Sequence, residues 1–285
     1  MFRTRVWKWP VMPTVLPLPM QRGRHLTISD LHCNIFLFNF FGRGLSRLDR
    51  RWFRPEAVSV TDLSPDLERQ LQDLRDRVLD ENTRINLTAL REPEKCWIGN
   101  VLDSLPMLDI LEKVGNPKKL LDVGTGGGFP LLPLALAMPE SRWAGLDSTG
   151  KKIEAIRRIA KDRGIANIDL VIGRAEDIAR DKTHREQYDV VTARAVADLA
   201  ALLEFTSPFA KVGGFVVLWK SMKADEEIES SKKAQHELHI PFAFSHTYTL
   251  PGDFGERQLL VFRKGSATPK MYPRPVGVPG KLPLK

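Results

Sequence analysis

The chain has 285 residues, of which 42% are apolar, and a formal net charge of +8. This length and composition allow one substantial core with at most a small accessory domain. The sequence contains no run of ~18 uncharged apolar residues that could span a bilayer, so we expect a soluble protein with no membrane partner.

The two cysteines, Cys33 and Cys96, stand alone, without CxxC spacing or a nearby pair of histidines. That pattern argues against both a disulfide framework and a zinc site. We therefore expect no bound metal and a reducing compartment, the cytoplasm.

Positive charge is concentrated at the two ends of the chain. Residues 1–54 contain ten Arg or Lys and two acids, residues 263–285 contain six Arg or Lys and no acid, and residues 55–262 carry a net charge of −6. Such ends are typical of arms that bind nucleic acid, because clustered cations release counterions when they neutralise phosphates. A solvated tail is the alternative, which is favoured for the N-terminal end and stays open for the C-terminal end.

The first segment, residues 1–60, contains recurring prolines and shows no helical or strand periodicity. The prolines interrupt the apolar stretch that a secretory signal would need. We expect an irregular basic extension that is either disordered or upstream of the true start of translation.

Residues 61–115 are predicted to form a small helical preface to the main domain. Ser64, Pro65 and Asp66 supply a capping serine, a proline at the first helical position and an acid in the first turn. Apolar residues then follow at helical spacing. A second helix is expected from Pro93 to Lys113.

Residues 116–264 alternate short apolar strands with amphipathic helices. The expected strands are 119–123, 143–146, 168–172, 188–192 and 215–219, and the expected helices lie near 130–138, 150–163, 175–182, 198–210 and 224–238. This alternation predicts an α/β fold with a doubly wound, mostly parallel sheet. Segments 242–249 and 258–263 have no helix between them and are expected to add an antiparallel hairpin at one edge, which makes seven strands. That ending is similar to the one in class I S-adenosylmethionine-dependent methyltransferases, which have a Rossmann-like fold; residues 265–285 follow as a basic, proline-rich tail.

A glycine-rich turn, 124–128, follows the first expected strand. Ligands of such sheets bind at the carboxyl ends of the strands, and Gly124, Gly126 and Gly128 let the backbone approach a ligand closely and adopt positive φ. A dinucleotide fingerprint would need a glycine at position 129, where this chain has Phe129. The spacing therefore favours S-adenosylmethionine over NAD, with a purely structural turn as the alternative.

Acidic residues follow the next two strands. Asp147 closes the second strand and is placed to accept hydrogen bonds from the two ribose hydroxyls. Ala175 and Glu176 follow the third strand, where backbone amides and a carboxylate would meet the adenine. Each acid alone is compatible with an ordinary surface residue. Two of them at strand ends of one sheet indicate a binding site for S-adenosylmethionine.

Cations end the fourth and fifth strands, at Arg194 and Lys220. The chain lacks the Asn/Asp-Pro-Pro-aromatic turn common in amine methyltransferases and the nucleophilic cysteine needed for pyrimidine carbon. A ring nitrogen such as guanine N7 has an in-plane lone pair and needs no general base, so catalysis can rest on positioning. We expect Arg194 and Lys220 to hold phosphates or the methionine carboxylate; alternatively, Arg194 pairs with Asp198 on the next helix.

Seven short motifs occur in order along about residues 62–285, and a basic ending, Thr268 to Arg274, follows them. They are Asn86-Leu87-Thr88, Asp103-Ser104-Leu105, Asp122 to Pro130, Leu146-Asp147-Ser148, Ala193-Arg194-Ala195, Leu218-Trp219-Lys220 and Gly255-Glu256-Arg257. Together they resemble the bacterial small-subunit rRNA methyltransferase G family, also called glucose-inhibited division protein B. In that family a histidine often stands where this chain has Asn100, which puts the rate or the substrate in doubt rather than the fold.

The resemblance implies methylation of guanine N7 in 16S rRNA of the small ribosomal subunit or its assembly intermediate, with S-adenosylmethionine as the donor. By position, the cofactor contacts are Gly124, Phe129, Asp147, Ser148, Thr149, Ala175, Glu176 and Arg194, and the glycine turn adds Gly126 and Gly128. The candidates for the RNA side are Lys220, Arg257 and, in the basic tail, Lys270, Arg274 and Lys281. We expect a monomer. The alternatives are a methyltransferase of another substrate and a non-catalytic RNA-binding homologue.

Overall fold

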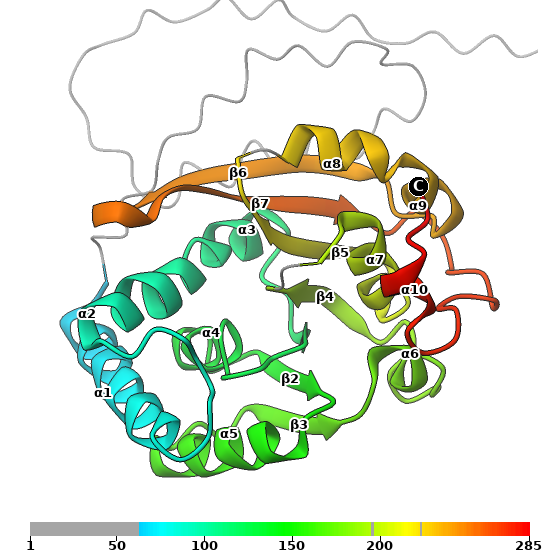
Figure 1. The fold of residues 1–285 in the computed structure, drawn as a ribbon. Coiled ribbons are helices and arrows are strands. Elements are labelled where there is room, and N and C mark those ends of the chain that lie inside the picture. Colours follow the sequence, from blue (N-terminus) through cyan, green and yellow to red (C-terminus); the bar gives the residue numbers. More distant parts are fainter. Residues whose placement is uncertain (1–62, 195–196, 223) are drawn as a thin grey trace, which may run out of the picture. The chain divides into compact units, whose positions relative to one another are not determined.

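The computed structural model describes residues 63–194, 197–222 and 224–285 (Figure 1). The expected extension 1–60 lies outside the described residues. The strands are β1 (Lys119–Val123), β2 (Arg142–Asp147), β3 (Ile168–Ile172), β4 (Tyr188–Ala193), β5 (Ala210–Lys220), β6 (Phe242–Leu250) and β7 (Gly255–Arg263). They form one seven-stranded sheet in the order β3-β2-β1-β4-β5-β7-β6. The predicted doubly wound α/β fold is confirmed.

Helix α1 (Pro65–Asn82) begins where the sequence predicts. The Oγ of Ser64 accepts a hydrogen bond from the amide of Leu67 at 3.3 Å, which satisfies one of the free N–H groups of the first turn. Leu71, Leu74 and Val78 are fully buried, so the predicted apolar face packs into the core.

The prediction of one continuous helix from Pro93 to Lys113 is wrong. The segment consists of α2 (Pro93–Cys96), a π-helical turn η3 (Trp97–Val101), a 3-10 turn η4 (Leu102–Ser104) and α3 (Met107–Lys113). Pro106 explains the break before α3, because proline lacks the N–H that a continuous helix would use and restricts the residue before it. The irregular turns η3 and η4 bury the polar side chains of Asn100, Asp103 and Ser104.

Alternate residues of the strands enter two separate cores, one on each face of the sheet. Leu120 in β1 and Val190 in β4 belong to the first core, whereas their neighbours Leu121 and Val191 belong to the second. This alternation is the period of two of a β-strand, and both faces are apolar because helices cover both.

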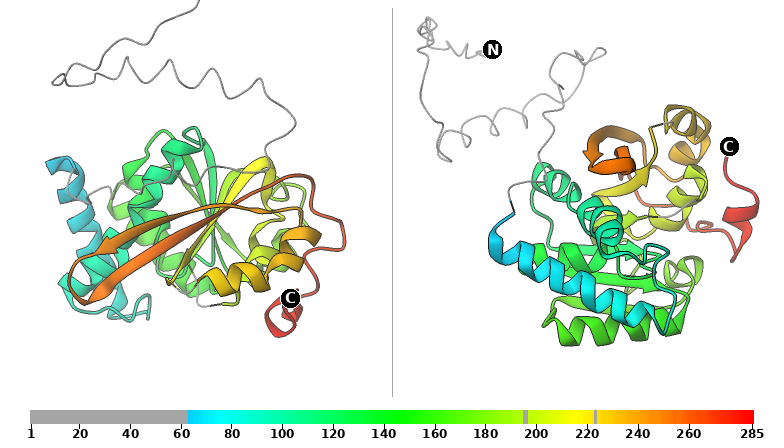
Figure 2. Two further views of the ribbon diagram at one scale, coloured as in Figure 1. Left: turned by 90° about the horizontal axis from the view of Figure 1, so that it is seen from above. Right: turned by 60° about the vertical axis from the view of Figure 1, so that its left-hand side comes forward.

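Helices cover the sheet on both faces, as Figures 1 and 2 show. The first core is completed by α1, α3, α4 (Leu131–Ala137) and α5 (Gly150–Asp162). The second is completed by α6 (Ala175–Ile178), α7 (Leu199–Thr206), α8 (Ala224–Ser230) and α9 (Lys232–Glu237). A last short helix, α10 (Val278–Lys281), packs near α7. No helix in the described ranges is long and apolar enough to cross a membrane.

Strands β6 and β7 form the predicted antiparallel hairpin, a long ribbon at one edge of the sheet (Figure 2). β7 also pairs antiparallel with β5, whereas β1 to β5 pair parallel with one another. The turn of the hairpin contains the 3-10 turn η5 (Gly252–Phe254). The hairpin therefore brings the residues around position 254 back toward the helical preface, where the ring of Phe254 lies against Gly99.

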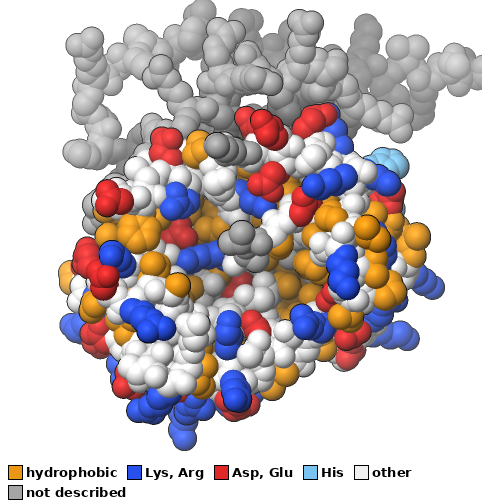
Figure 3. All heavy atoms as spheres, in the orientation of Figure 1, with side chains coloured by type: hydrophobic (Ala, Val, Ile, Leu, Met, Phe, Trp, Pro, Cys, Tyr) orange, Lys and Arg blue, Asp and Glu red, His pale blue; other side chains and the backbone are white. Residues whose placement is uncertain are grey.

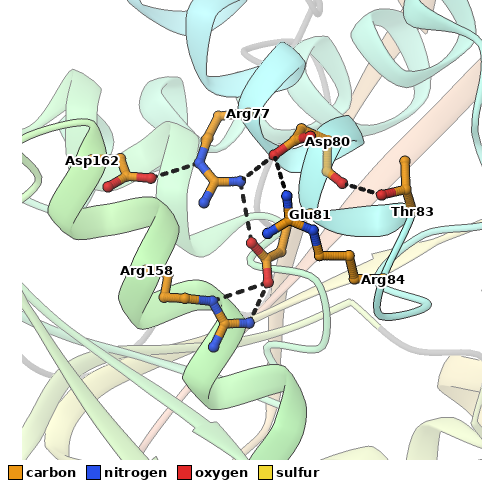
Figure 4. Close-up of polar contacts among 7 residues, drawn as sticks. All are labelled: Arg77, Asp80, Glu81, Thr83, Arg84, Arg158 and Asp162. Carbon is orange, nitrogen blue, oxygen red and sulfur yellow. Dashed lines mark hydrogen bonds and ion pairs between the residues drawn. The ribbon is translucent and has the colours of Figure 1, made fainter.

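A buried carboxylate joins α1 to α5 (Figure 4). Glu81 is fully buried; its Oε1 accepts from Nε of Arg158 at 3.1 Å and its Oε2 lies 3.2 Å from Nη1 of Arg77. Arg77 in turn donates to Asp162 at 2.7 Å. These hydrogen bonds lower the pKa of Glu81, the bond from Arg158 most of all. The preface is thus fixed to the main domain by charge as well as by apolar packing.

Candidate functional site

The glycine turn lies between β1 and α4 and is held against the end of β2. The amides of Gly124 and Thr125 both donate to the carbonyl of Leu146, at 2.7 and 3.0 Å. Gly124, Gly126 and Gly128 have φ values of 75°, 55° and 89°, a region that glycine adopts without strain. The predicted need for positive φ at these three positions is confirmed.

The glycines of the turn have different surroundings. A Cβ added at Gly124 would meet no atom within 4 Å, whereas one at Gly128 would lie 2.5 Å from Cδ1 of Leu132. Phe129 is 8% exposed and packs in the first core. There is therefore open space beside Gly124. Gly128 lies close to Leu132 of α4, and the side chain of Phe129 packs in the first core.

A cavity of about 220 Å³ opens beside the turn, at the carboxyl ends of β1, β2, β3 and β4. Five of the predicted cofactor residues line it, namely Gly124, Asp147, Ser148, Ala175 and Glu176. The other predicted cofactor residues, Gly126, Gly128, Phe129, Thr149 and Arg194, do not line it. The structure thus brings half of the predicted cofactor residues together in the lining of one cavity, and the other half are not part of that lining.

Asp147 is oriented by two backbone amides. Its Oδ2 accepts from Gly126 N at 2.9 Å and its Oδ1 accepts from Thr149 N at 2.7 Å. Gly126 and Thr149 therefore act on the cavity through Asp147. Because each carboxylate oxygen has further acceptor capacity, Asp147 can still accept hydrogen bonds from a pair of hydroxyls in the cavity.

Glu176 also lines the cavity and lies in the short helix α6. Its side chain is buried, and its Oε1 accepts a hydrogen bond from the amide of Gly277 at 2.9 Å. Gly277 lies 101 residues further along the chain. The C-terminal segment therefore reaches the wall of this cavity.

Asp122, which belongs to the glycine-turn motif but is not among the predicted site residues, is a buried acid at the end of β1. It is completely buried, and neither of its carboxylate oxygens has a hydrogen-bond partner among the described residues. Burial raises the pKa of Asp122 to about 7, although nearby Thr125 and Arg194 lower it. Val123 and Gly124, the next residues along the chain, line the cavity. The available signal in the sequence was an acid inside an otherwise apolar strand, Leu120 to Val123.

The residues around this cavity fit S-adenosylmethionine. Asp122 has a buried carboxylate without a partner, which a cationic group would stabilise. Asp147 presents the acceptor pair that a ribose requires, and the open space beside Gly124 lets the ligand approach the backbone. Asp147 and the open space beside Gly124 thus fit a nucleoside in the cavity, and a cationic chain on it would stabilise Asp122, which is buried next to the lining residue Val123.

A second cavity, of about 900 Å³, adjoins the first and shares Ala197 with it. Its wall combines the aromatic residues Trp219 and Phe254 with three cations and three carboxylates. The charged residues are Arg194, Lys220, Arg257, Asp103, Asp198 and Glu227. Figure 3 shows a hollowed face on which basic, acidic and apolar side chains come together. Residues 195 and 196, next to Ala197, lie outside the described ranges.

Arg194 connects the end of β4 to the π-helical turn η3. Its Nη2 donates to the carbonyl of Gly99 at 2.6 Å and to Oδ1 of Asn100 at 2.9 Å, and its Nη1 lies 3.4 Å from Oδ2 of Asp103. The alternative pairing with Asp198 is wrong. Asp198 lies at the start of α7, where its Oδ1 accepts from the amide of Ala200 at 3.0 Å.

Asp103 is the centre of the buried polar contacts in the second cavity. Its Oδ1 accepts from the hydroxyl of Tyr248 at 2.6 Å, and its carbonyl accepts from Nε1 of Trp219 at 2.9 Å. Burial and the carboxylate of Asp103 raise the pKa of Tyr248. Asn100, where the resemblance leads us to expect a histidine, donates to Oγ1 of Thr88 at 2.9 Å. The contacts of Asp103 with Tyr248 and Trp219 could not be read from sequence spacing, since the partners are 145 and 116 residues apart.

Lys220 and Arg257 also line the second cavity, but they differ in their partners. The Nζ of Lys220 donates to the carbonyl of Ala197 at 2.7 Å and to Oε2 of Glu227 at 2.6 Å. Arg257 donates to the carbonyl of Glu256 at 2.9 Å and has no carboxylate partner among the described residues. Lys220 is therefore placed to position the segment between the cavities, whereas Arg257 keeps an uncompensated charge.

The three predicted RNA-binding residues of the tail lie outside both cavities. Lys270 and Lys281 are exposed. Arg274 is only partly exposed, and its guanidinium donates to both oxygens of the buried carboxylate of Glu204. Two of the three predicted residues thus face solvent, and the third, Arg274, is already paired within the protein.

The chain is similar to proteins of one sequence family. Residues 67–248 match the protein family described as rRNA small subunit methyltransferase G. A relative of that name from Lactobacillus delbrueckii subsp. bulgaricus is 38% identical over 223 residues, which cover 78% of this chain and 93% of the relative. Another, from Streptococcus pyogenes serotype M12, is 40% identical over 204 residues, 71% of this chain and 85% of the relative. A solved O-methyltransferase from Bacillus cereus, in complex with SAH, is 16% identical over 67% of this chain and 91% of that chain, with a TM-score of 0.49.

Proposed function

The chain belongs to the rRNA small subunit methyltransferase G family, and from this premise we propose that it methylates N7 of a guanine in 16S rRNA of the small ribosomal subunit. It is an S-adenosylmethionine-dependent methyltransferase. The observation that carries the proposal for the acceptor is the second cavity, which adjoins the cofactor cavity at Ala197 and has aromatic walls. Aromatic side chains are the usual partners on which an unstacked RNA base lies.

The charges of the second cavity support a ring nitrogen as acceptor. Arg194 lies beside Asp103 and Lys220 beside Glu227, so both cations at the strand ends are balanced by carboxylates. Guanine gains positive charge when N7 is methylated, and uncompensated cations beside it would oppose that charge. The pairing of these two cations reduces this repulsion, and the third cation of the cavity, Arg257, is assigned to an RNA phosphate instead.

The reaction needs little more from the protein than orientation. S-adenosylmethionine supplies a methyl group on a sulfonium, and N7 already has an in-plane lone pair, so no group has to remove a proton. Arg194 and Lys220 hold the ends of β4 and β5 and the carbonyl of Ala197 in fixed positions. We assign to both a positioning role, because catalysis by orientation depends on keeping such walls in place.

We also assign contacts with RNA phosphates to three cations, namely Arg257 and the exposed tail lysines Lys270 and Lys281. Arg257 stands at the second cavity without a carboxylate partner among the described residues. Its neutralisation is expected to weaken RNA binding and to reduce the dependence of that binding on salt. This proposal places the enzyme where small subunits are made, in the cytoplasm, and requires no second copy of the chain.

The decisive experiment uses labelled S-adenosylmethionine with three acceptors: naked 16S rRNA, small subunits lacking the modification, and precursor particles of the subunit. Borohydride reduction followed by aniline cleavage identifies 7-methylguanosine and its position. Cleavage at one guanine that coincides with the label supports the proposal, and the best acceptor identifies the substrate particle.

Three outcomes would overturn it. Label on an exocyclic amine or on carbon excludes N7. Binding of S-adenosylmethionine by calorimetry without transfer to any of the three acceptors indicates another substrate. RNA binding without affinity for S-adenosylmethionine indicates a non-catalytic homologue.

A further inference from the structure

The last residues of the chain, 265–285, follow a defined path over α6 and α7, and we call this segment the C-terminal strap. It leaves β7 beside Lys264, whose buried ammonium donates to the carbonyl of Ser207 at 2.9 Å and to the hydroxyl of Thr268. Figure 1 shows α10 of the strap near α6 and α7 and the end of the chain beside α9. A solvated tail would lack such contacts.

Backbone carbonyls of the first half of the strap are held by arginines of the main domain. Arg185, just before β4, donates to the carbonyl of Thr268 at 2.8 Å and to that of Tyr272 at 3.0 Å. Arg180 donates to the carbonyl of Pro273. Arginines outside the strap therefore bind the strap, which is the reverse of a basic arm that reaches outward.

The firmest contact of the strap is between Arg274 and Glu204 of α7. Glu204 is completely buried, and its two oxygens accept from Nε of Arg274 at 3.0 Å and from Nη2 at 2.7 Å. The same carboxylate accepts from the backbone amide of Arg274 at 2.7 Å. These hydrogen bonds raise the pKa of Arg274. A bidentate arginine–carboxylate pair has a defined geometry. The pair therefore holds residue 274 of the strap in one position against α7.

Immediately after this pair the strap touches the wall of the cofactor cavity. Gly277, with φ of 81°, donates its amide to Glu176, and Glu176 lines the cavity. Gly280 in α10 approaches the ring of Phe205, another lining residue. At its end, Lys285 pairs with Asp198 of the second cavity at 2.7 Å. The strap thus supports residues of both cavities from outside.

We propose that Arg274 is a positioning residue of the cofactor site: by binding Glu204 it holds the strap so that Gly277 orients Glu176 at the end of the cavity next to α6. The contacts through which Arg274 acts are those of Glu204, Gly277 and Glu176, and none of them involves RNA. The proposal differs from the expectation that Arg274 binds RNA, because its guanidinium is paired inside the protein. It rests on the cofactor cavity and not on which base is methylated.

The test compares Arg274→Ala, Arg274→Lys and Glu204→Gln with the wild type in binding of S-adenosylmethionine, measured by calorimetry without RNA. Arg274→Ala and Glu204→Gln are expected to weaken binding roughly tenfold, the factor that corresponds to one hydrogen bond to a charged group. Arg274→Lys keeps the charge but loses the bidentate geometry and is expected to fall between them and the wild type. In methyl-transfer assays, KM for S-adenosylmethionine is expected to rise while kcat and KM for RNA stay unchanged.

Arg142→Ala is the control for loss of a bidentate pair away from the cavity, because Arg142 binds Asp169 at 2.8 and 3.0 Å on the surface, at the opposite ends of the strands. Its affinity for S-adenosylmethionine is expected to equal that of the wild type. If Arg274→Ala does not fold, truncation after Val276 provides the second variant; it keeps the pair with Glu204 but removes Gly277 and α10, and the same loss of affinity is expected.

Hydrogen exchange gives an independent readout. Bound S-adenosylmethionine is expected to slow exchange of the Gly277 amide in the wild type but not in Arg274→Ala. Wild-type affinity for S-adenosylmethionine in a folded Arg274→Ala protein would overturn the proposal, as would a loss of RNA affinity alone. Because the binding experiments contain no RNA, they succeed or fail independently of the proposed guanine acceptor.

Discussion

Replacement of Asp122 by asparagine is expected to stabilise the protein at neutral pH and to weaken its binding of S-adenosylmethionine. Asp122 is completely buried at the end of β1, without a hydrogen-bond partner among the described residues. The ionised carboxylate therefore lowers the stability of the ligand-free protein. A cationic ligand in the neighbouring cavity would stabilise this carboxylate, and the same charge would then strengthen ligand binding.

The magnitude follows from the pKa of Asp122, which burial raises from 3.8 to about 7. The folded state then binds a proton that the unfolded state has already lost between pH 4 and pH 7. Stability consequently falls as pH rises through this window, by about 1.4 kcal/mol per pH unit and about 4 kcal/mol in total. Asparagine resembles the neutral acid in shape and does not titrate, so Asp122→Asn escapes this loss.

The assay is urea unfolding of wild type and Asp122→Asn at pH 5, 6, 7 and 8. The free energy of unfolding of the variant minus that of the wild type is expected to increase by about 2.5 kcal/mol from pH 5 to pH 8. Asp169→Asn is the control: Asp169 also lies in a strand, but its hydrogen bond with Arg142 lowers its pKa. That variant should show no such increase.

Calorimetry completes the experiment. We expect Asp122→Asn to bind S-adenosylmethionine at least roughly tenfold more weakly at pH 8 and to lose less at pH 6, where the wild-type carboxylate is largely protonated. A stability difference that does not change with pH, or a variant less stable than the wild type at pH 8, would refute this account of Asp122.

Three further substitutions test other parts of the structure. Glu81→Gln removes the carboxylate that joins α1 to α5 and should cost about 2 kcal/mol in urea unfolding at pH 7; because Arg158 lowers the pKa of Glu81, the loss should diminish as pH falls below about 4.3. Gly124→Ala places a Cβ at φ of 75° beside the cofactor cavity and should cost about 1–2 kcal/mol of stability and weaken cofactor binding in calorimetry; unchanged affinity would show that this space is not used. Arg194→Lys cannot reproduce the contacts with the η3 carbonyls and Asp103 and should slow methyl transfer at saturating cofactor at least roughly tenfold; a loss of cofactor affinity alone would instead place Arg194 at the cofactor.

Several parts of the fold follow from local signals. The cap at Ser64, the positive φ values of the glycine turn and the edge hairpin were all predicted correctly, because each depends on residues close together in the sequence. The helix from Pro93 to Lys113 was predicted as one element, and the irregular turns in it were missed. Those turns depend on tertiary contacts: they bury Asn100 and Asp103 against Arg194.

The candidate site shows the same division. Asp147 and Glu176 could be selected from their positions after strands, because the carboxyl ends of parallel strands meet at one edge of a sheet. The partner of Arg194 could not be selected, since Asp198 is near in sequence but faces the start of its own helix, and Asp103 is distant in sequence. Arg274 was assigned to RNA from local composition, and Glu204, 70 residues away, was not considered as its partner.

The sequence by itself determined the alternation of strands and helices, the glycine turn and the family, because these depend on local propensity, on the period of apolar residues and on short ordered motifs. Only the tertiary structure decided which charges are paired, which acid is buried without a partner and where the C-terminal strap lies. The physical reason is that pairing and burial depend on contacts between residues 70 to 145 positions apart. The charged residues can be counted from the sequence, but whether each one faces solvent, a ligand or an oppositely charged side chain depends on the tertiary structure.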